Sequence, residues 1–372
     1  MSSSILFFAV HTLAFVAGLA LVIATIESTI NTLIVPRAIS SHFARWLYMN
    51  MLGLFKLRLS LVKNLTYERR DRIMVMYAPL TLFVLPFVWL TQVMLGYTLM
   101  FWGLRHGSLW ESFLVSGSSL LTLGTIVFPE GRPWITLLMF SEAMMGMVLV
   151  ALLIAYLPTI YSAFSEREKA VIKLATPAGT PPSPITMLIR LWRVGDEEFE
   201  ETLHTIWLDW RDWFTGIDES HTSFAALVFF RSSKSAQSWI TSAGVVLDAA
   251  ALTNSALDIP HDVRADLCIR SGYVALRDIA DFFRVDYQQD PEPTQVISVS
   301  REEFEAVCDE LADAGLPVRT DRDQAWEDFR GWRVNYDTVL LSLASMTMAP
   351  YANWISDRSS PVIASQSKQE SN

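Results

Sequence analysis

The chain has few of the residue patterns that mark disulfides or metal sites. Its 372 residues include two cysteines, Cys268 and Cys308, which gives little sign of an oxidising compartment. His204 and His221 lie 17 positions apart, and the sequence contains neither an HExxH motif nor a paired CxxC motif. No residues resemble a paired acid–base or nucleophile site. We therefore expect no enzyme activity, no metal site and no cofactor.

The balance of apolar and charged residues points to two different surroundings. Hydrophobic residues make up 51% of the chain, and the mean hydropathy is +0.30. A chain with this composition is too apolar for an ordinary soluble protein. Its 39 acidic residues, however, exclude a protein that is buried throughout. One part of the chain should therefore lie in a membrane and another part in water.

Three long apolar runs lie in the first half of the chain. They cover Ile5–Thr25, Ile73–Leu104 and Trp134–Phe164, and each reaches the roughly 20 residues that a bilayer core requires. The leading "MSSS" lacks the basic residues of a signal peptide, so we expect 1–25 to remain as an N-terminal transmembrane anchor. The sequence thus predicts a multi-pass protein of the cell membrane, with the lipid bilayer as a partner.

The charged segment 26–72 predicts the orientation. It contains eight basic and three acidic side chains, a net charge of 8 − 3 = +5, which places it in the cytoplasm by the positive-inside rule. The N-terminus is then outside. Within this basic segment, "FARWLYMNMLGLFKLRL" is typical of an amphipathic helix at the membrane interface.

The stretch "SFLVSGSSLLTLGTIVFPEGR", Ser112–Arg132, is apolar but crowded with Ser, Gly and Thr. If it crossed the membrane, the basic cluster of Arg167, Lys169 and Lys173 would lie outside. If it entered and returned, that cluster would share the side of the basic segment, as the charge rule favours. A re-entrant segment requires a pore or a cavity around it. The alternative is a small-residue helix packed between other helices.

These parts resemble the pore domain of potassium channels. The family shares four features with this chain, in the same order. They are an outward span, a re-entrant segment that begins with an aromatic residue, a Thr–apolar–Gly signature and an inward span with a central glycine. The resemblance covers about 73–168 and implies four pore loops around an axis, hence a homo-oligomer, with a tetramer favoured. It assigns Trp110, Ser116, Ser118 and Ser119 to a pore helix, Thr122, Leu123, Gly124 and Thr125 to a filter, and Gly146 to the inner span.

The filter departs from the family's pattern. That pattern is TVGYG, in which stacked backbone carbonyls replace the water shell of the ion. Here Thr125–Ile126–Val127 stands where the family has Tyr–Gly–Asp, and a β-branched Ile126 resists a positive φ. We expect fewer ordered carbonyl sites and poor discrimination between potassium and sodium. A pore fold that does not conduct remains an alternative.

Glu142 is an ionisable residue near the middle of the third run, where such a side chain is a candidate for function. It shares a helical face with Gly146, Leu149 and Leu153 by its spacing. That face either lines a cavity, where the carboxylate attracts cations, or packs so that Glu142 bonds to a pore-helix serine. Gly146 is either a hinge or a close helix contact.

The second half of the chain is acidic and helical in pattern. The stretch "TPAGTPPSP" favours a Pro-rich linker at 169–184, before a helical cytosolic domain at 185–357 and a disordered tail at 358–372. Residues 185–372 carry 16 basic and 31 acidic side chains, a net charge of −15. This charge disfavours nucleic acid and anionic lipid as partners and makes a contact with the basic segment reasonable.

Helical periodicity and caps predict several elements in this half. Phe199, Leu203, Ile206, Trp210 and Phe214 share one face of a helix, and Ser300 with Glu303 forms a capping box. Further helices are expected at 236–257, 262–283 and 322–346. Trp207, Trp210 and Trp213 form a stripe that favours core or interface, and we expect the domain to self-associate through it. No sustained strand pattern and no GxGxxG motif appears.

Two functions follow from the sequence. The first is an all-α, channel-like membrane protein for monovalent cations, potassium among them, with a helical cytosolic domain for assembly or gating. The second is a non-conducting membrane sensor or scaffold that retains a pore fold.

Overall fold

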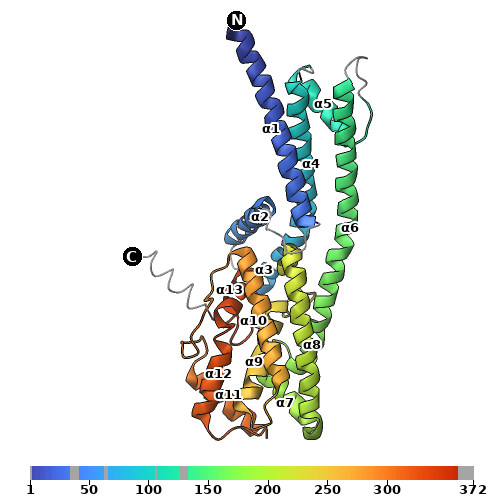
Figure 1. Ribbon diagram of the computed structural model, residues 1–372. Helices are drawn as coiled ribbons and strands as arrows, with labels where there is room; N and C mark the ends of the chain where they lie inside the picture. The colour runs from blue at the N-terminus through green and yellow to red at the C-terminus, as the bar shows by residue number, and fades with distance from the viewer. Residues whose placement is uncertain (1, 34–41, 63–65, 105–106, 126–132, 359–372) are drawn as a thin grey trace. The chain divides into compact units, whose positions relative to one another are not determined.

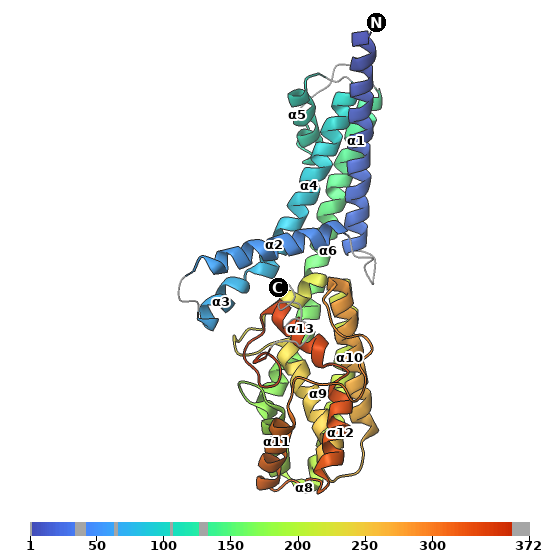
Figure 2. The same ribbon diagram turned by 90° about the vertical axis from the view of Figure 1, so that its left-hand side faces the viewer.

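The computed structural model describes residues 2–33, 42–62, 66–104, 107–125 and 133–358. Figure 1 and Figure 2 show these residues as helices and connecting segments. Within these ranges no strand forms, and the one isolated β-bridge pairs Leu257 with Val318. The chain divides into two compact units, unit 1 with residues 1–61 and 76–162, and unit 2 with residues 62–75 and 163–372.

Three helices are long and apolar enough to cross a membrane, as the three runs predicted. They are α1 (Ser2–Leu33), α4 (Tyr77–Gly103) and α6 (Pro133–Ala178). The second candidate span covers Tyr67–Gly103, so it also includes a separate short helix, α3 (Tyr67–Met74), whose C-cap is Val75. The third helix continues past the apolar run, so that its residues from Ala163 onward belong to unit 2.

In unit 1, α1 packs closely along α4 through glycines. A Cβ added to Gly18 would lie 2.4 Å from the carbonyl oxygen of Gly96, and one added to Gly103 would lie 2.6 Å from that of His11. Small residues at such crossings let two backbones approach, as in packed membrane helices. Polar contacts follow the same seam, where the Trp89 indole donates to the Ser28 hydroxyl at 3.3 Å. The predicted anchor is therefore an integral part of unit 1.

Helix α2 (His42–Ser60) forms in the basic segment where an amphipathic helix was expected. Leu47, Tyr48, Leu52, Phe55 and Leu59 are buried, and the Tyr77 hydroxyl donates to the carbonyl of Tyr48 at 2.8 Å. The other side of α2 is also apolar and is exposed, with Trp46, Met49, Leu54 and Leu57 beside Lys56 and Arg58. One face thus packs on the protein and the second has no protein cover within unit 1.

Unit 2 is a helical bundle around a buried helix. Helix α9 (Trp239–Ala256) is buried at every residue, because its sequence is apolar or small on all sides. It contacts α7, α10, α12 and α13. The bounds of the remaining elements of unit 2 are α7 (Pro184–Val194), α8 (Asp196–Ser223), the 3₁₀ helix η1 (Ala225–Phe229), α10 (Val263–Phe283), α11 (Arg301–Asp313), α12 (Arg322–Arg333) and α13 (Asp337–Thr347).

Several sequence predictions for unit 2 are confirmed. The capping box of Ser300 and Glu303 is present at the start of α11. Phe199, Leu203 and Phe214 are fully buried on the predicted face of α8. The predicted helix at 322–346 is wrong in one respect, since it breaks between Arg333 and Asp337.

A buried charge network spans that break. The Arg333 guanidinium pairs with Asp248 on α9 and with Asp337 on α13, and it donates to the carbonyl of Trp354 at 2.5 Å. The Tyr336 hydroxyl donates to Asp248 at 2.9 Å. Arg333, Tyr336 and Asp337 stand at i, i+3 and i+4, the spacing of one helical face. Each of these buried charges is paired, so the network joins α9, α12 and α13 without leaving an isolated buried charge.

The tryptophan stripe and the linker at 169–184 differ in the structure from what the sequence predicted. Trp207 and Trp210 are buried and Trp213 is half-buried, so the tryptophan stripe is mostly core of unit 2 and is not a free surface for self-association. Helix α6 continues to Ala178, so most of the predicted linker 169–184 is helical, with Val171 and Leu174 buried. Of the predicted tail, all but Arg358 lies outside the described residues.

Unit 2 also includes part of the basic segment. Arg231 pairs with Asp71 of α3 at 2.8 Å, and the Tyr67 hydroxyl donates to the carbonyl of Ser235 at 3.2 Å. A contact between the basic segment and the acidic half was expected. In this ion pair, however, the basic segment contributes the acid and the acidic half contributes the base.

A buried arginine joins the final turns of α6 to α8 and η1 within unit 2. The Arg167 guanidinium donates to the carbonyls of Leu227 at 2.7 Å and Phe230 at 2.8 Å, and it pairs with Glu168. Nε2 of His221 lies 3.3 Å from the guanidinium, which only donates, so Nε2 is the unprotonated nitrogen. Burial, and then the charge of Arg167, hold the pKa of His221 well below its usual range.

This environment predicts a pH-dependent stability of unit 2. In the unfolded chain His221 takes up a proton below about pH 6.5, whereas in the folded chain it stays neutral. The contribution of His221 is therefore complete above about pH 6.5 and falls as the pH drops, by up to about 1.4 kcal/mol per pH unit. His221→Gln keeps an acceptor for Arg167 but cannot titrate. Urea unfolding between pH 7.5 and 5, followed by tryptophan fluorescence, should show a steeper loss for the native chain. Parallel curves would contradict this assignment.

Candidate functional site

The candidate site is built around α5 (Leu109–Leu120), which begins at a complete cap. The Ser108 side chain accepts from the backbone N–H of Glu111 at 3.2 Å, and the Glu111 carboxylate accepts from the N–H of Ser108 at 2.6 Å. This capping box satisfies two helix-end donors and places a negative charge where the helix dipole favours it. Trp110, the aromatic residue expected at the start of a pore helix, is 65% exposed and stacks on Phe113.

Helix α5 is short and lies against α4. Its 12 residues extend about 18 Å, which is less than the ~30 Å core of a bilayer. Figure 1 and Figure 2 both show it beside one end of α4. The side that it buries is mostly polar and small, with Ser112, Val115, Ser116, Ser118, Ser119 and Leu120. The segment 126–132, which includes the final "PEGR" of the stretch Ser112–Arg132, lies outside the described residues.

The end of α5 has a defined backbone geometry at the predicted filter. The N–H of Leu123 donates to the carbonyl of Ser118 at 2.9 Å, and that of Thr122 to the carbonyl of Ser119 at 3.0 Å, as in a Schellman motif. Thr122 has φ +55° at the position where glycine is usual. A β-branched residue in this region is strained by about 1–3 kcal/mol, and such strain is concentrated at functional sites.

Gly124 repeats the positive φ two residues later. Its φ is +63°, and a Cβ added there would meet no atom within 4 Å. The conformation of the backbone, rather than a lack of space, therefore favours glycine at this position. Leu123 lies between Thr122 and Gly124, and it is 62% exposed.

Ser118 ties this loop back to α5. Its hydroxyl oxygen accepts from the N–H of Thr125 at 3.2 Å and lies 3.2 Å from the Thr125 hydroxyl. The predicted filter residues 122–125 are all exposed in unit 1. Hydrogen bonds to α5 hold the loop at Thr122–Leu123 and at Thr125. Ser119, by contrast, is buried, and its hydroxyl has no partner among the described residues.

Ser116 connects three helices at a buried point. Its hydroxyl lies 2.8 Å from the carbonyl oxygen of Met94 on α4 and 2.5 Å from Oε1 of Glu142 on α6. Glu142 is fully buried, and its Oε2 atom has no partner within the described part of the chain. Nearby, the hydroxyls of Tyr97 and Ser141 lie 3.0 Å apart and join α4 to α6 again. Glu142 therefore bonds a serine of α5, which is the second of the two arrangements considered for it.

Gly146 is a close contact between α6 and the end of α5. A Cβ added there would lie 2.4 Å from the carbonyl oxygen of Leu120, which is closer than real Cβ atoms approach backbone. This contact corresponds to the packing alternative for Gly146. It also brings the α6 backbone directly behind the residues that precede the predicted filter.

The two sides of α6 differ in cover. Glu142 and Gly146 are buried, with Leu149 and Leu153 half-buried, so the face predicted from their spacing is turned toward α4 and α5. The other side exposes a set of large apolar side chains, Phe140, Met144, Met147, Val148, Ile154 and Leu157. In the single chain it is this apolar side, and not the Glu142 face, that is open.

Sequence reasoning found most of these residues but missed their partners. The Met94 carbonyl is a backbone group and left no signal. The contacts of Gly96 and Gly103 with α1 did have a signal in the sequence. Two glycines seven residues apart in an apolar run share a helical face. Their place on α4 explains how α1 approaches a helix that also supports α5.

Comparisons of this chain with protein-family models, with curated proteins and with solved structures found no match. Among the described residues, no group of three or more His, Cys, Asp or Glu side chains is arranged to hold a metal ion. The interpretation of the site therefore depends on its own geometry.

The Ser116–Glu142 contact predicts how α5 is held. Glu142→Ala removes this bond and leaves a cavity, and we expect amide hydrogen exchange in 109–121 to become about tenfold faster, the effect of losing one buried hydrogen bond. Glu142→Gln keeps a hydrogen-bonding group and should exchange almost as the native chain does. Met144→Ala, on the exposed side of the same helix, is the matched control. Equal exchange in Glu142→Ala and Met144→Ala would mean that Glu142 does not hold α5.

Proposed function

We propose that this chain is an integral membrane protein whose unit 1 forms an ion-channel-like pore for monovalent cations, and that unit 2 is a cytoplasmic domain for assembly or gating. Membrane insertion is supported by the surface of unit 1. In the most apolar 18-residue stretch of α6, only 11% of the residues are buried. A helix with so much exposed apolar surface requires lipid or further protein around it.

Aromatic residues support the same placement. Trp134 and Tyr161 of α6 are 74% and 71% exposed and lie 27 residues apart. At 1.5 Å per residue this spacing is about 40 Å, close to the thickness of a bilayer with its headgroup regions. Trp and Tyr are enriched at such interfaces. The exposed side of α2, with Trp46 beside Lys56 and Arg58, fits the cytoplasmic interface in this proposal.

The observation that carries the pore proposal is the end of α5. A helix too short to cross the bilayer ends in a loop where Thr122 and Gly124 both have positive φ. The negative end of the helix dipole is directed at this loop, which favours a cation there. Backbone carbonyls in such a loop are the ligands that potassium pores use. Four copies around an axis, with the open apolar side of α6 turned to neighbouring copies or lipid, complete the pore.

One observation favours the non-conducting alternative. The exposed side chain of Leu123 offers no ligand to an ion, and the hydroxyl of Thr125 is already bonded to the Ser118 hydroxyl at 3.2 Å. A loop with these properties also suits a membrane sensor or scaffold that retains the pore fold. Flux measurements distinguish the two functions.

Two alanine substitutions provide a matched test. Gly124→Ala places a Cβ at positive φ, which costs about 1–2 kcal/mol and displaces the loop. Gly117→Ala places one within α5, where the nearest atom would be the Met94 sulfur at 3.8 Å, an ordinary contact. In liposomes that contain the purified protein, we expect potassium and sodium flux from the native chain and from Gly117→Ala, and none from Gly124→Ala.

Assembly is the control for this experiment, because a loss of flux must not come from unfolding. All three proteins should elute as the same oligomer in detergent. If the native chain passes neither potassium nor sodium at any voltage or pH, and Gly124→Ala assembles normally, the scaffold function replaces the channel function.

A further inference from the structure

Glu142 is the only acidic residue in the apolar run Trp134–Phe164, and the protein covers it completely. Leu138 and Met145, one turn before and one turn after it on α6, pack in an apolar cluster that also contains Val115 of α5. A carboxylate is strongly disfavoured in such surroundings unless a positive charge or several hydrogen bonds compensate it. The groups around Glu142 therefore decide whether it is ionised.

The helices that pack on Glu142 supply no positive charge. Helices α4 and α5 contain no lysine, arginine or histidine. The nearby ionisable group on α4 is Tyr97, whose hydroxyl lies 3.0 Å from that of Ser141. The one acid on α5 is Glu111, and its carboxylate accepts the N–H of Ser108 at the start of the helix. Within the described residues, nothing from α4 or α5 compensates a charge on Glu142.

The contacts of Ser116 require one more hydrogen than its hydroxyl carries. Its Oγ lies 2.8 Å from the carbonyl oxygen of Met94 and 2.5 Å from Oε1 of Glu142. If Glu142 were ionised, both neighbours would only accept, and a hydroxyl has a single hydrogen to donate. If Glu142 is protonated, it donates to Ser116 and Ser116 donates to Met94. Only Oε2 then lacks a partner among the described residues, and it is an uncharged carbonyl oxygen.

We propose that Glu142 holds a proton in the folded protein and that this proton fastens α5 to α6. When it is lost, the carboxyl O–H bond breaks, the proton passes to water, and a carboxylate without a counter-charge remains. That charge is solvated only if α5 moves away and water enters. Because opening releases a proton, it becomes easier as the pH rises. The proposal concerns the packing of unit 1 and holds whether or not the loop of Thr122 and Gly124 conducts ions.

Infrared spectroscopy detects the proton directly, because a neutral carboxylic acid has a carbonyl stretch that a carboxylate lacks. The full chain is measured at pH 7 in dodecyl maltoside, a detergent without carbonyl groups. The native chain should show this band, and Glu142→Gln should lack it. If the native chain and Glu142→Gln give the same spectrum in this region, Glu142 is ionised and the proposal is wrong.

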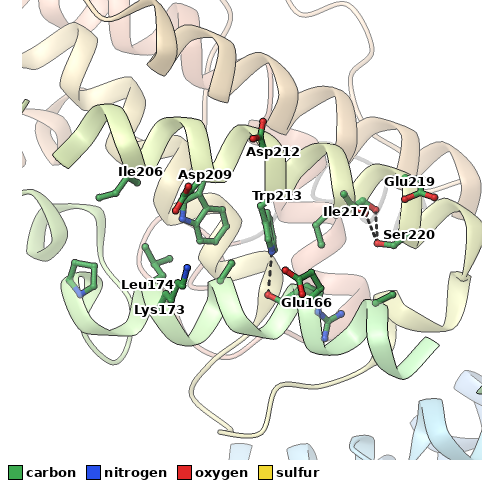
Figure 3. A pocket seen from close by; sticks show the side chains of 16 residues that line it. Glu166, Lys173, Leu174, Ile206, Asp209, Asp212, Trp213, Ile217, Glu219 and Ser220 are labelled. Atoms are coloured by element: carbon green, nitrogen blue, oxygen red, sulfur yellow. Dashed lines mark hydrogen bonds between the residues drawn. The ribbon is translucent and has the colours of Figure 1, made fainter. Parts of the chain in front are cut away.

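Two controls secure the assignment of the band. Glu166, an exposed acid on the part of α6 that belongs to unit 2 (Figure 3), pairs with Lys169. Glu166→Gln is therefore the matched substitution and should keep the band. In a native chain made with glutamate that is isotopically labelled at its side-chain carboxyl carbon, the band should shift without any substitution. A band that does not shift belongs to another residue type and would contradict the proposal.

Hydrogen exchange of the amides in 109–121 tests whether the proton holds α5. Protection is measured relative to an unstructured peptide at the same pH, and at pH 5 it should be similar in the native chain and Glu142→Gln. Between pH 5 and pH 8 it should fall in the native chain and in Glu166→Gln by up to about tenfold per pH unit, because one proton leaves on opening. Glu142→Gln has no proton to lose and should keep its protection. Equal pH dependence in all three proteins would overturn the proposal.

Discussion

The arrangement of unit 1 depends on one buried polar contact among three helices. Ser116 of α5 lies between the backbone of α4 and the carboxyl group of Glu142 on α6. A polar group of this kind is costly in an apolar interior unless it is hydrogen-bonded, so the three helices have a strong reason to keep their register. The close contact of Gly146 with Leu120 fixes the same register sterically. Both constraints act directly behind the loop of Thr122 and Gly124.

This arrangement also explains the uneven cover of the apolar helices. Glycines bring α1 close to α4, and α4 in turn supports α5. As a result, 44% of the residues are buried in the most apolar 18-residue stretch of the span Tyr67–Gly103. The corresponding stretch of α6 is 11% buried because only the side with Glu142 and Gly146 packs on its own chain. In the proposed function, the uncovered side of α6 meets lipid and neighbouring copies. A single chain is then one part of the pore.

The sequence predicted those features that depend on local pattern. Examples are the apolar runs, the capping box of α11 and the buried face of α8. Each follows from the periodicity or chemistry of residues that are close together in the sequence. The break between α12 and α13 was missed, because residues 334–336 include neither proline nor glycine. The tryptophan stripe was expected in core or interface, and its expected use in self-association could not be tested from the sequence, since only tertiary packing decides which aromatic residues of a helix are covered. Glu142 left two alternatives, and the position of Ser116 on another helix decides between them within the single chain.

The central claim is that the segment after α4 enters the membrane and returns on the same side. Single cysteines at residues 2, 107 and 180 test it directly in intact cells, because the native Cys268 and Cys308 are buried and contribute little background. A membrane-impermeant thiol reagent should label positions 2 and 107 from outside and should reach position 180 only after the cells are opened. Labelling of position 180 in intact cells would mean that the segment crosses the membrane, and it would contradict the re-entrant pore.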